Sequence, residues 1–182
     1  WTISREERNN TDMAMENTPR EEIRRIVEAQ RKFFRSGKTL DVKFRKENLR
    51  ALKRAMEKWE KPLADALWQD LHKSYEEAYL TELSIVLGEI RNHISHLSKW
   101  AAPKRVCTPL KMFPSRSKVV QEPLGCSLIM APWNYPVQLL LNPLVGAISA
   151  GCTAVLKPSP YVPHVSRVLE DMISETFDAE YI

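Results

Sequence analysis

Residues 125–159, "GCSLIMAPWNYPVQLLLNPLVGAISAGCTAVLKPS", decide the fold. They begin with the apolar run 126–130 and end with a second apolar run, 152–156, before a short polar tail. Continuous runs of this kind are typical of strands buried on both faces of a parallel sheet. A helix with Asn142 as N-cap and Pro143 as first residue would join the two strands. Strand, helix and strand in this order predict an α/β fold with parallel strands.

The segments on either side of this stretch complete the predicted order of elements. Apolar residues recur upstream at helical spacing. The expected helices cover residues 18–37, 42–59, 62–71 and 76–100. Thr18 and Pro62 would begin the first and third of them, and Gly37 would end the first. Residues 117–122 would form a further strand, and residues 163–177 would form a last helix.

These elements divide the chain into four parts. They are a polar segment at 1–17 that we interpret as an added leader, a helical part at 18–102, a strand-and-loop region at 103–124 and a βαβα unit at 125–182. The hydrophobic share of 43% and the charged share of 27% are typical of a globular domain with a core. No apolar stretch approaches the roughly 20 residues that a membrane helix needs.

The positive charge of the chain lies in its first third. Residues 1–60 carry 16 Lys and Arg against 11 Asp and Glu, whereas the whole chain has a net charge of +4. A basic helical segment can bind nucleic acid or anionic lipid. Acidic residues alternate with the basic ones throughout, so a solvated helix face explains the surplus better. We therefore predict no nucleic-acid partner.

Cysteine and histidine usage indicates no disulfide and no metal site. Cys107, Cys126 and Cys152 are odd in number and form no CxxC pair, which is typical of a reducing, cytoplasmic location. None of them has a neighbouring base, so all three are interpreted as packing residues. His93 and His96 are three residues apart on a predicted helix, but no third metal ligand accompanies them.

Two proline-bracketed loops, 131–136 and 157–160, follow the two predicted strands. Ligands of open parallel sheets bind outside the carboxyl ends of the strands, and adjacent strands would place these loops side by side. Lys157 could bind ribose hydroxyls or phosphate there, and the Asn134 amide could face a developing oxyanion. The spacing alone leaves open whether the loops are functional or only stiff turns. No GxGxxG fingerprint is present.

Residues 122–159, "EPLGCSLIMAPWNYPVQLLLNPLVGAISAGCTAVLKPS", closely resemble the aldehyde dehydrogenase superfamily, and within it the class 3-like branch. The specific motif is PWNYP followed by A-G-x-x-x-V-L-K-P-S, and the resemblance extends over residues 18–182. It implies an NAD(P)-dependent oxidation of a small-molecule aldehyde to a carboxylic acid through a cysteine thioester. It also implies the start of a Rossmann-like domain that lacks the usual glycine fingerprint.

The resemblance assigns roles to particular residues of the two loops. Asn134 would be the oxyanion-hole side chain and the one catalytic residue of this chain, and Tyr135 would lie near the substrate tunnel. The cofactor, NAD or NADP, would lie along Ala131, Pro132 and Trp133, with its adenosine ribose hydroxyls on Lys157 and with Ser159 close by.

The departures from the family pattern are equally specific. The nucleophile of the family lies in a G-Q-x-C setting and its general base in an E-L-G-G stretch, and neither motif is present. We therefore interpret the chain as the N-terminal part of an enzyme and expect this part alone to be inactive. We expect the complete enzyme to be a dimer. A C-terminal membrane anchor of the complete enzyme would not be visible in this sequence. The alternative is a standalone nucleotide-binding or regulatory module. Pro160 stands where the family often has glutamate.

Overall fold

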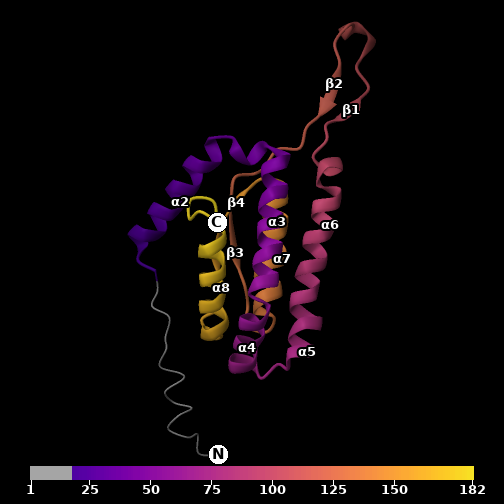
Figure 1. Ribbon diagram of the computed structural model, residues 1–182. Helices are drawn as coiled ribbons and strands as arrows, with labels where there is room; N and C mark the ends of the chain where they lie inside the picture. The colour runs from indigo at the N-terminus through magenta and orange to yellow at the C-terminus, as the bar shows by residue number, and fades with distance from the viewer. Residues whose placement is uncertain (1–17) are drawn as a thin grey trace, which may run out of the picture.

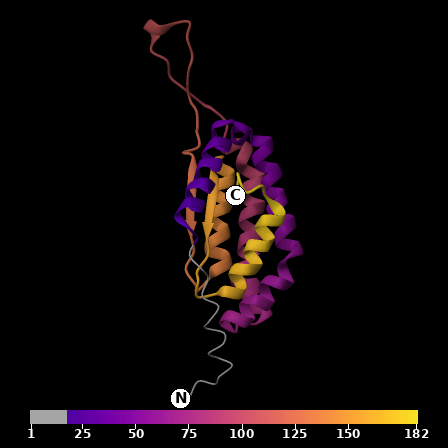
Figure 2. The ribbon, with the colours of Figure 1, turned by 90° about the vertical axis from the view of Figure 1, so that its left-hand side faces the viewer.

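The computed structural model describes residues 18–182. Helices make up most of the molecule, and a two-stranded parallel sheet lies along one side of them (Figure 1, Figure 2). The helical elements that precede this sheet are α2 (Arg20–Arg35), η1 (Lys38–Leu40), α3 (Val42–Lys58), α4 (Glu60–Leu71), α5 (Tyr75–Ala78), the π-helical turn η2 (Tyr79–Leu83) and α6 (Ser84–Trp100). All four helices expected from the apolar spacing are present.

Three boundaries in this helical layer differ from the prediction. Helix α2 starts at Arg20, because the backbone of Pro19 is extended (ψ 146°) and Pro19, not Thr18, takes the N-cap position. Helix α4 starts two residues before Pro62, which lies in the first turn, where a missing N–H costs nothing. The long helix expected over 76–100 is interrupted by the π-helical turn η2.

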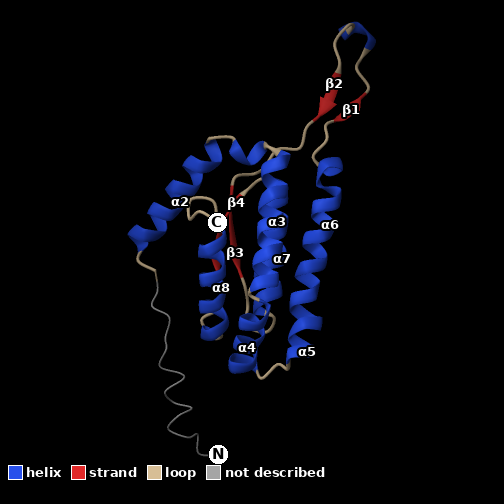
Figure 3. Ribbon diagram, viewed as in Figure 1, coloured by secondary structure: helices blue, strands red, loops and turns tan. Residues whose placement is uncertain are grey.

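The second half of the chain forms the predicted βαβα unit. Its elements are β3 (Cys126–Met130), α7 (Pro136–Ala150), β4 (Thr153–Lys157) and α8 (Pro163–Thr176). The two strands are parallel, with Cys126 opposite Thr153 and Met130 opposite Lys157. The α/β fold class predicted from the sequence is therefore confirmed. Figure 3 shows the two strands beside the helices.

The predicted start of α7 at Asn142 and Pro143 is wrong. The helix begins at Pro136, and Pro143 lies inside it. An internal proline removes one backbone hydrogen bond and costs about 3 kcal/mol in an isolated helix. The preceding turn carries Leu140 and Leu141, which are 1% and 0% exposed, and the burial of these side chains outweighs that cost.

Helix α7 lies between the sheet and the helices α3 and α6 (Figure 2). The largest fully buried side chains come from both halves of the chain and include Leu49, Leu52, Met56, Leu63, Leu67, Leu83, Ile90, Leu140, Leu141, Leu144, Ile148 and Leu169. The expectation that β3 is buried on both faces is wrong for the described residues. Ile129 is buried, but Leu128 and Met130 point to the opposite face and are 62% and 66% exposed.

An antiparallel hairpin projects from the molecule (Figure 1, Figure 2). Strand β1 (Lys104–Val106) pairs with β2 (Ser117–Val119), and the short helix η3 (Leu110–Met112) lies at the tip. The strand expected over 117–122 is thus present but shorter. Leu110 and Phe113 at the tip are 89% and 82% exposed. Within residues 18–182 no helix combines the length and the apolar character needed to cross a membrane.

Candidate active-site loops

The two loops leave the sheet side by side. Met130 and Lys157 are the last paired residues of β3 and β4, so both chains turn away at the same end of the sheet. The backbone N–H of Ala131 donates to the carbonyl of Lys157 at 3.1 Å, which joins the first residue of one loop to the last strand residue of the other. The sequence brings together, at the carboxyl ends of parallel strands, the residues that were expected to meet there.

The first loop, residues 131–136, presents most of its predicted site residues to solvent. The exposed residues are Pro132, Trp133, Asn134 and Tyr135, while Ala131 is half-buried. Trp133 is 55% exposed, which is unusual for an apolar ring of this size. Asn134 is likewise exposed, and the hydrogen bond that holds this residue runs through its backbone carbonyl.

That carbonyl is held by a lysine which the sequence analysis did not single out. Lys73, in the turn after α4, donates to the Asn134 carbonyl at 2.8 Å and to Glu82 Oε1 at 2.7 Å. Its ammonium also lies 4.0 Å from the centre of the Tyr135 ring. The Lys73 and Glu82 side chains are only 10% and 0% exposed, so the ion pair is buried beneath the loop.

The other oxygen of Glu82 caps helix α7. Glu82 Oε2 accepts from the backbone N–H groups of Val137 and Gln138 at 2.9 and 3.2 Å. The N-cap residue of this helix, Tyr135, offers no side-chain cap of its own. A negative charge at a helix N-terminus also interacts favourably with the helix dipole. One carboxylate therefore joins the lysine below the loop to the helix that follows it.

The second loop begins at the end of β4 and leads into α8. Lys157 and Pro160 are exposed, whereas Ser159 is 4% exposed. The Ser159 hydroxyl accepts from the backbone N–H of Tyr161 at 3.3 Å, and its carbonyl accepts from the Ser166 hydroxyl at 2.9 Å. These contacts bend the loop back onto α8. The structure thus gives Lys157 an open position, while it places Ser159 inside the turn.

Helix α8 is capped in the same manner as α7. Asp70, in α4, accepts from the backbone N–H of Val165 at 2.9 Å and from that of His164 at 3.4 Å. Its Oδ1 also lies 2.7 Å from His164 Nδ1. The Asp70 side chain is 3% exposed and that of His164 is 25% exposed. The N-cap residue, Val162, provides no side-chain bond, so Asp70 takes over that function.

The expectation that all three cysteines are packing residues holds only for Cys152. Cys107 and Cys126 are exposed, and all three are free thiols. Cys107 lies just beyond the projecting strand β1, and Cys126 lies on β3, so neither is covered by other described elements. His93 is held between Ser149 and Glu89, with its ring nitrogens 2.6 and 2.8 Å from their oxygens. No cluster of three or more potential metal ligands occurs within residues 18–182.

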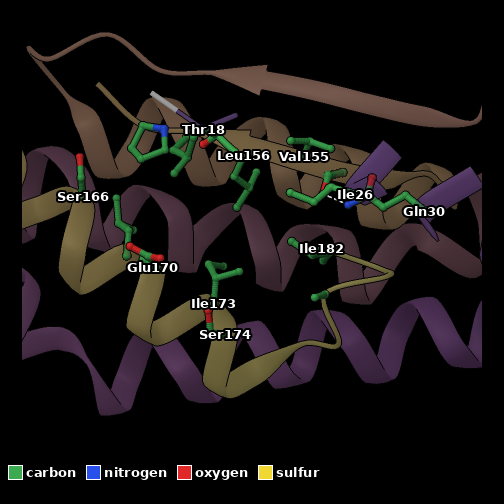
Figure 4. A pocket seen from close by; sticks show the side chains of 15 residues that line it. Thr18, Ile26, Gln30, Val155, Leu156, Ser166, Glu170, Ile173, Ser174 and Ile182 are labelled. Carbon is green, nitrogen blue, oxygen red and sulfur yellow. Dashed lines mark hydrogen bonds between the residues drawn. The ribbon is translucent and has the colours of Figure 1, made fainter. Parts of the chain in front are cut away.

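A separate apolar pocket of about 330 Å³ opens beside β4. Figure 4 shows Gln30 of α2, Leu156 of β4 and Ile173 of α8 around it. Gln30 Nε2 donates to the Ala154 carbonyl at 2.7 Å, which fixes α2 against the strand. None of the predicted site residues lines this pocket, because all of them lie on the two loops.

Comparison with known proteins shows the family of the chain. A model of the aldehyde dehydrogenase family matches residues 6–180. The chain belongs to this family. The 4,4'-diaponeurosporen-aldehyde dehydrogenase of Staphylococcus aureus (strain NCTC 8325 / PS 47) is 47% identical over 150 residues, which are 82% of this chain and 33% of that protein.

A relative from the class 3-like branch confirms that part of the resemblance. Aldehyde dehydrogenase family 3 member F1 of Arabidopsis thaliana is 38% identical over 169 residues, which are 93% of this chain and 34% of that protein. A solved structure described as the substrate bound state of Staphylococcus aureus AldH superposes with a TM-score of 0.85 and 45% identity, and covers 88% of this chain and 35% of that one. The chain spans about a third of the length of the relatives that it matches.

Proposed function

We propose that this chain supplies the oxyanion donor and part of the cofactor surface of an enzyme that oxidises aldehydes to carboxylic acids. The observation that carries the proposal is the Asn134 side chain, which is exposed on a loop whose backbone is fixed from below by Lys73. A rigid donor aimed at the carbonyl oxygen stabilises the negative charge that develops there, and it needs no reorganisation during the reaction. Family membership supports the same role.

The residues of the two loops fit a nicotinamide cofactor. Lys157 is an exposed cation at the carboxyl end of a parallel strand, and the exposed indole of Trp133 lies on the neighbouring loop. The bound cofactor would accept a hydride from the substrate. Lys157 would hold the ribose hydroxyls, with Ala131 and Pro132 along the cofactor. Ser159 would shape the loop from inside its turn, through the bond that it accepts from Tyr161.

The cofactor choice that we propose includes NADP as well as NAD. Pro160 is exposed, carries no charge and offers no side-chain acceptor to a ribose 2′-hydroxyl. A 2′-phosphate at this position would therefore meet no repulsion from it and would be attracted by Lys157.

In this proposal the chain contributes neither the nucleophilic thiolate of the reaction nor the general base that acts with it. Cys152 is buried, and Cys107 and Cys126 lie away from the loop residues that carry the proposed roles. The nucleophile and the general base that the resemblance requires would come from other parts of the enzyme. The family match and the relatives named above do not favour the alternative of a standalone regulatory module.

A homodimer is the assembly that we propose for the complete enzyme. The projecting hairpin exposes a group of apolar side chains to solvent. They are Val106, Leu110, Met112, Phe113, Val119 and Val120. Apolar patches of this kind on a projecting element mark protein–protein contact sites, and a second copy of the chain would cover them. The substrate proposed for the whole enzyme is a small-molecule aldehyde, and a reducing, cytoplasmic location remains a prediction from the free thiols.

The variant Asn134→Ala in the complete enzyme tests the proposal. We expect kcat to fall by about 10²–10³, the usual effect of removing one oxyanion-hole donor. The KM for the cofactor should change little, because the amide acts on the reacting carbonyl. The matched control is Asn92→Ala, the same change at an exposed position on α6. An unchanged kcat with weaker cofactor binding would make Asn134 a cofactor contact and refute the oxyanion role.

A further inference from the structure

The buried ion pair of Lys73 and Glu82 has contacts that the proposed function does not explain. We propose that these two side chains are positioning residues for Asn134: they fix the peptide after it and the start of α7, so that its amide is presented to the substrate in one orientation. The inference rests on the proposed oxyanion role of Asn134. Neither residue is exposed enough to meet a substrate, so both would act through the loop.

Lys73 fixes the loop through its backbone. Its ammonium donates to the Asn134 carbonyl, and this bond sets the plane of the peptide between Asn134 and Tyr135. The same ammonium lies 4.0 Å from the Tyr135 ring centre, so it also holds the side chain of the next residue. Because the Asn134 side chain is left exposed, the lysine constrains the position of the amide without occupying it.

Glu82 fixes the lysine and the helix together. One of its oxygens accepts from Lys73, and the other accepts from Val137 and Gln138 in the first turn of α7. Glu82 lies in the π-helical turn η2, a departure from regular helix that is frequent at functional sites. The carboxylate thereby links the turn after α4, the loop and α7 into one unit.

The burial of this pair argues for a role beyond stability. Two charges taken out of water cost several kcal/mol, and well-packed apolar residues often stabilise a protein as well or better. Lys61 and Asp65 form an exposed pair within one helix, and the bonds of this pair stay within α4. Lys73, in contrast, bonds to two different segments of the chain, one of which carries the proposed oxyanion donor.

The test variant is Lys73→Met/Glu82→Gln in the complete enzyme. It leaves no unpaired buried charge, and the amide oxygen at position 82 can still accept from α7, so the change isolates the contacts of the lysine with the loop. Lys61→Met/Asp65→Asn is the matched control, because it makes the same kind of change at a solvent-exposed ion pair with the same N–O distance of 2.7 Å. Lys73→Gln/Glu82→Gln is the milder variant, to be used if the double variant does not fold, because it replaces both charges by neutral polar groups and also leaves no buried charge unpaired.

Two measurements are made on each variant. The first is hydrogen exchange of the segment 131–138, which we expect to become at least about tenfold faster in the test variant and to stay unchanged in the control. The second is steady-state kinetics. We expect kcat to fall by about 10- to 100-fold, the scale of a misplacement of roughly 1 Å, with the cofactor KM within about twofold of wild type.

Addition of Asn134→Ala to the test variant separates action through Asn134 from other effects. The combined variant should lose no more kcat than Asn134→Ala does alone, because residues that act as a unit are not additive. Additive losses, or a normal kcat together with a lower melting temperature, would overturn the positioning role. If Asn134→Ala leaves kcat unchanged, the oxyanion proposal fails. In that case faster exchange of 131–138 would still support the positioning of the loop, and unchanged exchange would overturn it.

Discussion

The two loops at the end of the sheet share one construction but differ in how much of each loop is held. Both lead into a helix that begins with proline, Pro136 or Pro163, and neither helix is capped by its own preceding residue. In both cases a carboxylate from the helical layer accepts from the first-turn N–H groups, Glu82 for α7 and Asp70 for α8. The first half of the chain thus supplies the N-terminal caps of α7 and α8, the two helices that follow the loops.

The difference lies in the partner of each carboxylate. Glu82 is paired with Lys73, which reaches on to the carbonyl of Asn134, so the first loop is held in its middle. Asp70 is paired with His164, which belongs to the capped helix itself, so this pair supports the second loop only where the loop ends, and the bond inside the loop, to the Ser159 carbonyl, comes from Ser166 of α8. The loop proposed to stabilise a transition state therefore has the more rigid support, as electrostatic preorganisation requires. The loop proposed to hold a ribose is shaped by its own turn.

Removal of Glu82 and removal of Asp70 should differ clearly in their effect on the free energy of unfolding. We expect Glu82→Ala to lower the free energy of unfolding by about 3–5 kcal/mol, because it leaves Lys73 buried without a counter-charge. Asp70→Ala should cost about 1–3 kcal/mol, because it removes only the cap, and the partly exposed His164 can bond to water instead. Chemical denaturation of the two variants provides the comparison.

The exposed carboxylate Asp65 offers a control for this pair of variants. Asp65→Ala removes an acid from a solvent-exposed pair and should change stability by less than about 1 kcal/mol. Equal losses for Glu82→Ala and Asp70→Ala would mean that the lysine adds nothing to the first support. Glu82 and Asp70 would then act only as equivalent helix caps, and the two loops would not differ in their support.

The sequence predicted the frame of this arrangement because the frame depends on local signals. Gly37 ends α2 in a left-handed conformation (φ 76°), which its lack of a side chain permits. The two apolar runs form adjacent parallel strands, and the proline-bracketed loops meet at their carboxyl ends. Each of these features follows from a few consecutive residues and their intrinsic conformational preferences.

The supports of the loops could not be predicted in the same way, because they join residues far apart in the chain. Glu82 is 55 residues from Val137, and no local pattern relates the two. One signal was present in the sequence. Glu82 belongs to a stripe with one residue every four positions, and the other members, Ala78, Val86 and Ile90, are fully buried. A charged residue within an apolar stripe indicates a buried partner. The start of α7 was missed for the same reason, because packing across the core outweighed the preference of Pro143.

The far end of helix α7 contacts a buried charged side chain, Arg45. Arg45 donates to the carbonyl of Ser149 at 3.2 Å and to that of Thr39 at 2.6 Å, and burial lowers its pKa. Gly151, the C-cap residue, has a φ of 86°, and an added Cβ would lie 2.7 Å from the Arg45 guanidinium. Gly151→Ala should therefore lower the free energy of unfolding by about 2–4 kcal/mol, through the positive φ and the displaced hydrogen bonds.

Gly88→Ala is the matched control, because Gly88 lies within α6 and an added Cβ there meets no atom within 4 Å. That change should be neutral or stabilising, since alanine favours helix more than glycine does. Thermal melting of both variants is sufficient. A Gly151→Ala protein as stable as wild type would show that Arg45 moves aside freely, and that α7 is supported only at the end next to the site.

The smallest effect is expected at the second loop, where Pro160→Glu should shift the cofactor preference towards NAD. Pro160 is exposed, so a carboxylate placed about 4 Å from a 2′-phosphate would repel each of its charges by about 1 kcal/mol in water. We expect the ratio of kcat/KM for NAD over that for NADP to rise by about five- to tenfold.

Pro160→Gln has the same shape as Pro160→Glu without the charge and should leave NADP use nearly unchanged. If glutamine shifts the ratio as much as glutamate, the effect comes from the lost ring of proline and not from charge. If neither variant shifts it, cofactor choice does not depend on residue 160. A shift with glutamate alone would show that this loop, which lacks a buried lysine like Lys73 beneath it, still places residue 160 close enough to the ribose to choose between the two cofactors.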